Sequence, residues 1–191
     1  TPLGYGLRIS YKYDYSGNIL IRDEQHNISE GEPLNLRYAY TYNGRGRQLR
    51  EVVSINGKVC ADVASAYDEL GRLQTKTAEN GLETEHKYNI QGWLSGITHR
   101  IKAPSVNLQT GDTLWIRNII FTEQLNYFKP QAAKPLYSGN IAEISWNRGR
   151  DVMGDNTYAY SYDMLGRLTD AELYKREPSE NFPGFSPLRD N

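Results

Sequence analysis

Residues 158–169 read Tyr158-Ala159-Tyr160-Ser161-Tyr162-Asp163-Met164-Leu165-Gly166-Arg167-Leu168-Thr169. Three tyrosines alternate with two small residues, and a period of two places the three rings on one face of a β-strand. Asp163 and Gly166 are turn residues, because Asp can bond its own backbone and Gly tolerates a positive φ. The stretch therefore predicts a strand, a tight turn and a second strand.

The same pattern recurs along the chain, and we call it the repeat turn. A repeat turn has a Tyr, an Asp or Asn directly after it, and a Gly four residues after the Tyr. The copies are Tyr13-Asp14 with Gly17, Tyr42-Asn43 with Gly46, Tyr67-Asp68 with Gly71, Tyr88-Asn89 with Gly92, and Tyr162-Asp163 with Gly166. A degenerate copy of the repeat turn ends at Gly139, and in this copy Pro135 occupies the position expected for the Tyr. A constant spacing inside each turn, with unequal separations between turns, is typical of stacked hairpins.

A second kind of turn lies between the repeat turns. Asn56-Gly57 and Asn80-Gly81 each stand between alternating apolar runs. Asn-Gly is a strong hairpin signal, because both residues tolerate the positive φ of a type I′ turn. With repeat turns at one edge and Asn-Gly turns at the other, the chain is predicted to be all-β, an antiparallel meander of repeated hairpins.

Composition shifts mark the boundaries of this array. We expect the repeats to occupy residues 1–175, with loops near 24–33, 102–112, 129–135 and 147–156. Residues 113–128 fit a strand or a helix by periodicity, and their aromatic and β-branched content favours a strand. Residues 176–191 contain several prolines and are expected to form an irregular tail.

The overall composition narrows the function classes. A formal net charge of -1 argues against a nucleic-acid binder that relies on phosphate contacts. No apolar run approaches the roughly 18 residues of a membrane span, and no signal peptide is visible at the start. The 15 tyrosines suit a sheet with one face in contact with water, since a Tyr ring packs while its hydroxyl stays hydrated.

No residue pattern predicts a catalytic or metal site. Asp14, Asp68 and Asp163 could be interpreted as paired acids and bases, but they recur in like environments, which favours turn capping. Cys60 is predicted to be a small buried residue. The three histidines have no metal-ligand spacing, so neither a metal nor another cofactor is expected.

The tryptophans support one ligand hypothesis. Trp93, Trp115 and Trp146, among many tyrosines, could form a platform on which sugars stack. Cross-strand pairing in a Tyr-rich sheet would need the same aromatic residues.

The repeat turns at Tyr67–Leu73 and Tyr162–Leu168 resemble the Rhs/YD-repeat family, which is named for its Tyr-Asp pair. Residues 136–146, followed by 158–171, are similar to the version found in Bacteroidetes-type Rhs proteins. The resemblance implies a β-hairpin spiral that winds, in relatives, into a hollow shell around a toxic C-terminal domain. Other relatives are surface or adhesion proteins. The family's self-cleaving core segment and a toxin domain are not found in these residues.

This resemblance sets the functional expectation. We expect a non-catalytic segment of a bacterial Rhs scaffold, extracellular or on the cell surface, that walls off or presents a toxin-like cargo. The alternative is a carbohydrate-binding adhesion module. The expected partners are the rest of a parent Rhs chain and its cargo domain, with glycans under the alternative. Because about six hairpins are too few to close a shell, exposed sheet edges should also favour self-association.

Overall fold

The computed structural model describes residues 6–27, 31–106, 109–149, 156–176 and 185–187. These residues form thirteen β-strands. Within them, no helix is long and apolar enough to cross a lipid bilayer. The chain divides into two compact units, Thr1–Leu82 and Glu83–Asn191.

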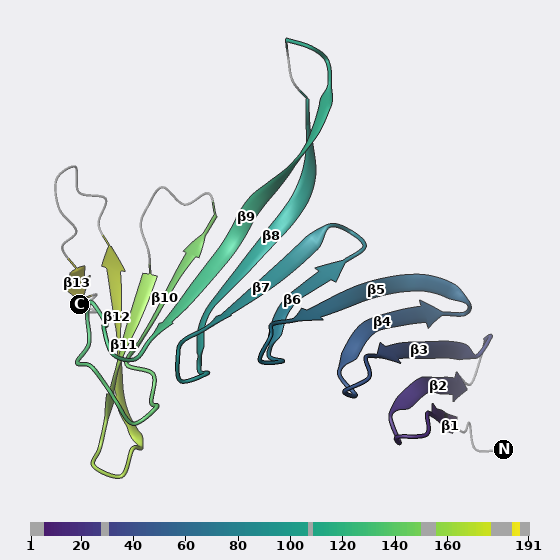
Figure 1. Cartoon of the computed structure of the whole chain (residues 1–191), viewed down its shortest axis with the longest axis horizontal. Coiled ribbons are helices and arrows are strands. Elements are labelled where there is room, and N and C mark those ends of the chain that lie inside the picture. Colours follow the sequence, from purple (N-terminus) through teal and green to yellow (C-terminus); the bar gives the residue numbers. More distant parts are fainter. Residues whose placement is uncertain (1–5, 28–30, 107–108, 150–155, 177–184, 188–191) are drawn as a thin grey trace. The chain divides into compact units, whose positions relative to one another are not determined.

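Unit 1 is an antiparallel meander, in which every strand pairs with the next one in sequence (Figure 1). In β3 the side chains of Leu34, Leu36 and Tyr38 are partly buried, while Asn35 and Arg37 between them are exposed. This part of the strand therefore has one apolar and one polar face. The strands are β1 (Gly6–Tyr13), β2 (Ile19–Asn27), β3 (Leu34–Tyr42), β4 (Gln48–Ile55), β5 (Lys58–Tyr67) and β6 (Leu73–Ala78).

Unit 2 continues in the same manner, with its strands hydrogen-bonded in sequence order. It contains β7 (Leu82–Tyr88), β8 (Leu94–Val106), β9 (Thr113–Asn126), β10 (Glu143–Arg148), β11 (Asn156–Tyr162), β12 (Leu168–Arg176) and β13 (Phe185–Pro187). β9 confirms the strand interpretation for residues 113–126, and residues 127 and 128 lie beyond its end. The all-β meander of hairpins predicted from the turns is therefore confirmed.

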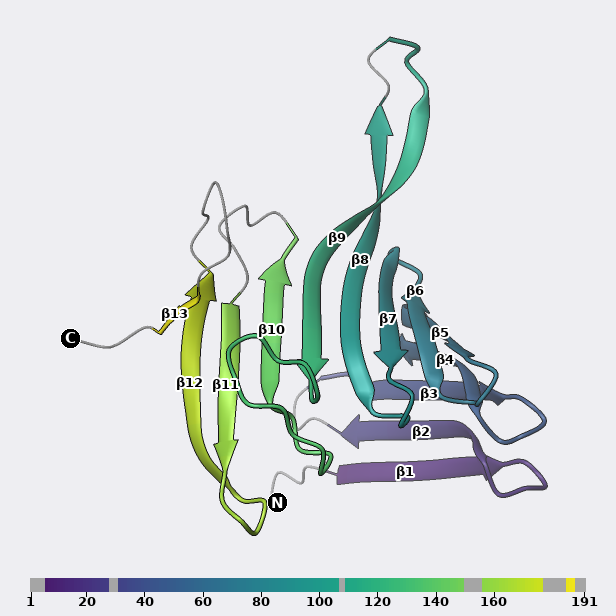
Figure 2. The same cartoon turned by 60° about the vertical axis from the view of Figure 1, so that its left-hand side comes forward.

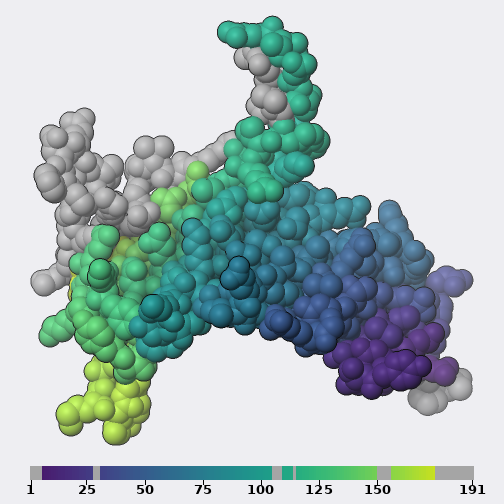
Figure 3. All heavy atoms as spheres, in the orientation of Figure 1, coloured from purple at the N-terminus to yellow at the C-terminus, as the bar shows by residue number. Residues whose placement is uncertain are grey.

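β8 and β9 extend beyond their neighbours as a two-stranded ribbon (Figures 2 and 3). β9 pairs with β10 only from Phe121 onward, yet its pairing with β8 runs out to Thr113 opposite Val106. Pro104 lies inside this ribbon, opposite Trp115, in a region that we had predicted to be a loop. A Pro fits a strand whose other edge is unpaired, because its missing N–H then leaves no gap in a ladder.

Other boundaries also differ from the expectations. β2 runs to Asn27 and β10 to Arg148, so both enter segments predicted as loops. The rest of the predicted loop at 147–156 falls mostly outside the described residues. β13 is a short strand within the predicted irregular tail, and its pairing ends at Pro187 opposite Tyr174.

The two Asn-Gly turns are not alike. Asn56 and Gly57 both have a positive φ, of 48° and 81°, as a type I′ turn requires. At the second turn only Gly81 has a positive φ, of 84°, and its amide donates to the carbonyl of Ala78. This is a longer loop with Gly in the left-handed position, so the type I′ prediction is wrong for Asn80-Gly81.

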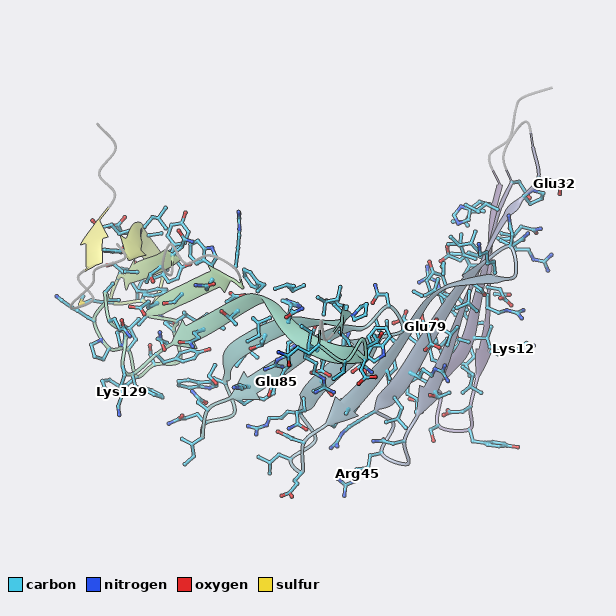
Figure 4. All side chains as sticks on the ribbon, turned by 90° about the horizontal axis from the view of Figure 1, so that it is seen from above. Lys12, Glu32, Arg45, Glu79, Glu85 and Lys129 are labelled. Atoms are coloured by element: carbon cyan, nitrogen blue, oxygen red, sulfur yellow. The ribbon has the colours of Figure 1, made fainter. Side chains whose placement is uncertain are left out.

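Burial is sparse, because each unit is a single layer of sheet with side chains on both faces (Figure 4). Among the described residues, the buried apolar side chains are Leu125, Tyr127, Ala142 and Ala159, all in unit 2. Cys60 is exposed rather than buried. It is the extra residue of a β-bulge, where the ladder passes from Val53–Ala61 to Ser54–Val59, and a bulge residue turns out of the pleat.

Candidate functional site: the stacked repeat turns

Each repeat turn is capped by the Asp or Asn that follows its Tyr. Asp14 Oδ1 accepts hydrogen bonds from the backbone amides of Ser16 and Asn18, at 2.8 and 2.9 Å. In the other turns a side-chain oxygen of the Asp or Asn accepts hydrogen bonds from the equivalent backbone amides. The donors are Arg45 and Arg47 to Asn43, Arg72 to Asp68, Trp93 to Asn89, and Leu165 and Arg167 to Asp163. The side chains that a catalytic interpretation would need are therefore engaged in turn capping.

The carboxylates carry depressed pKa values. The side-chain amide of Asn18, followed by its backbone amide, lowers the pKa of Asp14. The backbone amide and then the guanidinium of Arg167 lower the pKa of Asp163. Burial acts to raise the pKa of Asp68, but hydrogen bonds from Arg72 outweigh it and the pKa is lowered. Carboxylates held ionised in this way are poor general acids near neutral pH.

The Tyr of a repeat turn bonds to the preceding turn. The hydroxyl of Tyr42 donates to the carbonyl of Ile19 at 2.8 Å, and that of Tyr67 donates to the carbonyl of Gln48 at 2.7 Å. Tyr162 makes the same bond to Ile141, at 2.8 Å. In each case the acceptor is the second residue after the preceding Gly. Tyr13 and Tyr88 occupy the same place, as the last residues of β1 and β7.

Four of the turn glycines, Gly46, Gly71, Gly139 and Gly166, lie beneath a side chain from the preceding turn. Gly17, Gly46, Gly71, Gly92, Gly139 and Gly166 all have a positive φ, between 74° and 96°. A methyl group on Gly71 would collide with the guanidinium of Arg47, the residue after Gly46. On Gly139 it would lie 3.2 Å from the ring of Trp93, the residue after Gly92. The absence of a Cβ therefore serves both the turn and the stacking.

An expanded turn occupies residues 127–139, and sequence analysis missed its tyrosine. Tyr127 donates its hydroxyl to the carbonyl of Leu94 at 2.8 Å, which is the bond that the repeat-turn Tyr makes elsewhere. Pro135 marked the expected position only because the spacing was assumed to be constant. The usable signal was a Tyr directly after a strand, followed by a polar Pro-bounded insertion.

Glu143 anchors this expanded turn and was also missed. Its side chain is buried, and the backbone amides of Gln131 and Ala132 donate to Oε2 at 2.8 and 2.6 Å. Asn126 Nδ2 and Ser145 Oγ donate to Oε1 at 2.9 and 3.2 Å. These four hydrogen bonds fasten the insertion to the sheet.

The three tryptophans are not brought together. Trp93 packs on Tyr127 with ring centroids 5.1 Å apart, and Trp146 stacks on Tyr158 at 5.4 Å. Trp115 lies on the β8–β9 ribbon with the ammonium of Lys102 5.5 Å from its ring. None of the ring contacts among the described residues joins two tryptophans, so they form no shared platform.

The described residues contain no group of three or more His, Cys, Asp or Glu side chains placed to hold a metal ion. His26 lies 3.1 Å from Glu24, and His99 hydrogen-bonds Thr84 at 2.9 Å. The expectation that the chain uses no metal or cofactor stays a prediction.

Comparison with known proteins identifies the repeats. Residues 67–100 match the family model described as RHS Repeat. A probable deoxyribonuclease RhsA of Dickeya dadantii is 24% identical over 201 residues, an alignment that covers 86% of this chain and 13% of that protein. The chain thus spans about an eighth of the curated relative that it matches.

Solved structures show a weaker likeness. A porin-like protein from Bacteroides uniformis is 12% identical, with a TM-score of 0.33, over 94% of this chain and 87% of that one. A Photorhabdus luminescens Tc holotoxin pore is 14% identical, with a TM-score of 0.40, over 96% of this chain and 10% of that one. TM-scores this low add nothing to the assignment. Residues 67–100, which begin with the full repeat turn at Tyr67, are thus similar to the RHS Repeat, and together with the RhsA relative they support an Rhs/YD-repeat protein.

Proposed function

We propose that this chain is a structural, non-catalytic segment of the shell of an Rhs scaffold. The shell encloses or presents a toxin-like cargo of the same parent chain. The observation that carries the proposal is the bond from a repeat-turn Tyr to the carbonyl of the preceding turn, made by Tyr42, Tyr67, Tyr127 and Tyr162. Polar groups that recur in this way hold neighbouring hairpins together. A catalytic site instead needs unlike groups in one cleft.

A repeat array whose hairpins are stabilised by their neighbours is suited to a structural role in a shell. Each hairpin in such an array contributes a surface and binds the next hairpin, without needing a ligand. We place the scaffold at the bacterial cell surface or outside the cell, on the family resemblance alone. The nuclease activity in the name of the RhsA relative belongs to that protein, of which the matched part is 13%.

A hydrolase screen on the purified chain tests the non-catalytic role. The substrates are glycosides, esters, peptides, and linear and supercoiled DNA, the last because of the name of the relative. We expect no turnover above that of a boiled sample. DNA cleavage or another activity that disappears in Asp68→Asn or Asp163→Asn would overturn the proposal, because both variants keep the capping oxygen.

The enclosing role needs a test in the parent chain. Limited proteolysis should leave the region downstream of the repeats intact when the wall is intact. Tyr67→Phe combined with Tyr162→Phe removes two bonds between turns and should make that region cleavable, whereas Tyr15→Phe, at a fully exposed ring, should not. Equal cleavage of all three proteins would contradict enclosure.

The carbohydrate-binding alternative stays a prediction. Trp115 is the most exposed of the three tryptophans, at 61%. A glycan array, with Trp115→Ala as the control, would test the carbohydrate-binding alternative.

A further inference from the structure

The side chain that follows the Gly of a repeat turn takes one of two positions. We call it the post-glycine residue, and the examples are Asn18, Arg47, Arg72, Trp93, Asn140 and Arg167. In some turns it bonds to the Asp that caps its own turn, and in others it lies over the Gly of the next turn. Where the cap is an Asp or an Asn, the position follows from which of the two it is.

An Asp cap holds the post-glycine residue within its own turn. One carboxylate oxygen accepts backbone amides, and the second accepts a hydrogen bond from the post-glycine side chain. The pairs are Asp14 with Asn18, Asp68 with Arg72, and Asp163 with Arg167, at 2.8, 2.7 and 2.6 Å. Held in this way, Asn18 comes no nearer than 3.7 Å to the place where a Cβ would stand on Gly46, which is an ordinary van der Waals contact.

Asn43 caps its turn but does not hold Arg47. Its single side-chain oxygen already accepts the backbone amides of Arg45 and Arg47, both at 3.0 Å. The remaining group is an NH₂ donor, which offers nothing to a guanidinium that can only donate. The Arg47 guanidinium instead lies 5.7 Å from the centre of the Tyr67 ring and fills the space where a side chain on Gly71 would stand. The post-glycine residue is an arginine here and in the Tyr67 turn, so only the cap explains the difference.

The second Asn cap shows the same behaviour with an unlike side chain. Asn89 Oδ1 accepts the backbone amide of Trp93 at 2.9 Å. Among the described residues Asn89 Nδ2 is buried and has no hydrogen-bond partner. The Trp93 ring lies over the next left-handed glycine, 3.2 Å from the place of a Cβ on Gly139. An arginine and a tryptophan thus take the same position when the cap is Asn.

We propose that the capping residue selects how neighbouring hairpins are joined. An Asn cap releases the post-glycine side chain, which lies over the Gly of the next turn and holds the two hairpins together as a latch. An Asp cap retains that side chain. The joints after the Tyr42 and Tyr88 turns are latched in addition to the hydroxyl bond from the next Tyr, whereas the joint after the Tyr13 turn depends mainly on that hydroxyl bond. One Asp-or-Asn choice thus decides which joints of the array are stiff.

Asn43→Asp tests the selection directly. The substitution supplies the second acceptor oxygen, and Arg47 should then bond within its own turn. In nuclear magnetic resonance spectra the Nε–H signal of Arg47 should move toward those of Arg72 and Arg167, which already donate to a carboxylate. The variant should unfold near the midpoint of the unmutated protein, because one surface contact replaces another.

A double-mutant cycle with Gly71→Ala measures the latch. In the unmutated protein the new methyl group must displace Arg47, but in the Asn43→Asp background Arg47 has already left. The shift that Gly71→Ala causes in the unfolding equilibrium should therefore be about fivefold smaller in that background, as expected for one exposed cation–π contact. Arg47→Ala removes the latch outright and should give the same reduction. Urea denaturation measures all the equilibria.

Gly44→Glu is the matched control. It adds the same charge to the same turn, at the position that Glu69 occupies in the Tyr67 turn. No atom lies within 4 Å of the place of its Cβ, so the side chain is accommodated. Because the cap is still Asn43, Gly71→Ala should retain its full effect in this background. Far-UV circular dichroism establishes that each variant is folded.

Three outcomes would overturn the proposal. The first is an Arg47 Nε–H signal that stays unchanged in Asn43→Asp, a measurement that does not depend on the folding of the Gly71 variants. The second is an equal effect of Gly71→Ala in the unmutated and Asn43→Asp backgrounds. The third is an equal reduction by Gly44→Glu and by Asn43→Asp, because net charge and not the acceptor of the cap would then move Arg47.

Discussion

The repeat turn at Tyr67 and the expanded turn at Tyr127 make the same contact with very different lengths of chain. Tyr67 reaches its left-handed glycine, Gly71, in four residues, whereas Tyr127 is separated from Gly139 by a long Pro-bounded segment. Both tyrosines nevertheless donate to a carbonyl of the preceding turn, at 2.7 and 2.8 Å. The contact between turns is thus independent of what lies between Tyr and Gly.

The two turns differ in how the intervening backbone is satisfied. In the short turn Asp68 accepts the amide of Arg72 at 2.8 Å, and the segment needs nothing from outside. In the expanded turn the amides of Gln131 and Ala132 lie beyond the reach of a local cap and donate to Glu143 on β10. Backbone donors away from water must find an acceptor, so a longer insertion requires a buried one.

The largest effect should come from Glu143. Glu143→Ala leaves two backbone amides and Asn126 Nδ2 without their acceptor, which should lower the free energy of unfolding by about 3 kcal/mol. Urea denaturation measures it. Glu69→Ala, at an exposed glutamate of the short turn, is the control and should change stability by less than about 0.5 kcal/mol. Similar losses in both variants would show that the expanded turn is not held by Glu143.

Substitutions at two glycines distinguish the cost of backbone strain from the cost of lost side-chain stacking. Gly17 and Gly71 have nearly equal φ, 85° and 83°, but only Gly71 lies under the Arg47 side chain. Gly17→Ala should cost about 1 kcal/mol from the left-handed backbone alone. Gly71→Ala should cost about 2 kcal/mol, because Arg47 is also displaced from its position 5.7 Å from the Tyr67 ring. Equal denaturation midpoints would mean that Arg47 moves away without loss.

The hydrogen bond from the tyrosine hydroxyl should contribute equally to the free energy of unfolding in both turns. Tyr67→Phe and Tyr127→Phe each remove one hydroxyl donor and should cost about 1 kcal/mol, with the fully exposed Tyr15→Phe neutral. A clearly larger loss at either site would break the equivalence of the turns.

Alkaline titration sharpens this comparison. Burial raises the pKa of Tyr127. Its stabilising contribution is therefore complete below the unfolded pKa of about 10 and is lost as pH rises through the folded pKa. The unmutated protein should lose stability with rising pH more steeply than the Tyr127→Phe variant in this range. Parallel pH profiles would indicate that the hydroxyl is not protected.

The smallest effect should come from Asp163→Asn. Asn43 and Asn89 cap their turns through the same oxygen, so this variant should unfold at nearly the parent midpoint at pH 7. The pKa of Asp163 is lowered in the folded state, so its contribution is present above the unfolded pKa and is lost as pH falls through the folded one. The Asn variant should lose less stability on acidification, and an unchanged acid profile would contradict this assignment.

The alternating strands and most of the turns could be predicted because their causes are local. Asp163 caps amides two and four residues ahead, and Gly166 supplies a left-handed φ, so both roles follow from a few consecutive residues. The Asn80-Gly81 turn was misassigned because an Asn-Gly pair fits more than one loop, and its neighbours decide which forms. Pro104 was read as a break because its effect depends on whether the adjacent edge is paired.

By itself the sequence determined that this protein is an array of antiparallel hairpins with turns of one chemistry, because φ preference and side-chain capping act within a few residues. Only the tertiary structure decided which Tyr serves the expanded turn, that Arg47 fills the place of a side chain on Gly71, and that Glu143 is buried. These contacts join residues separated by a strand or more, as Tyr127 and Leu94 are. Their geometry depends on the register and stacking of whole hairpins, which no short stretch of sequence encodes.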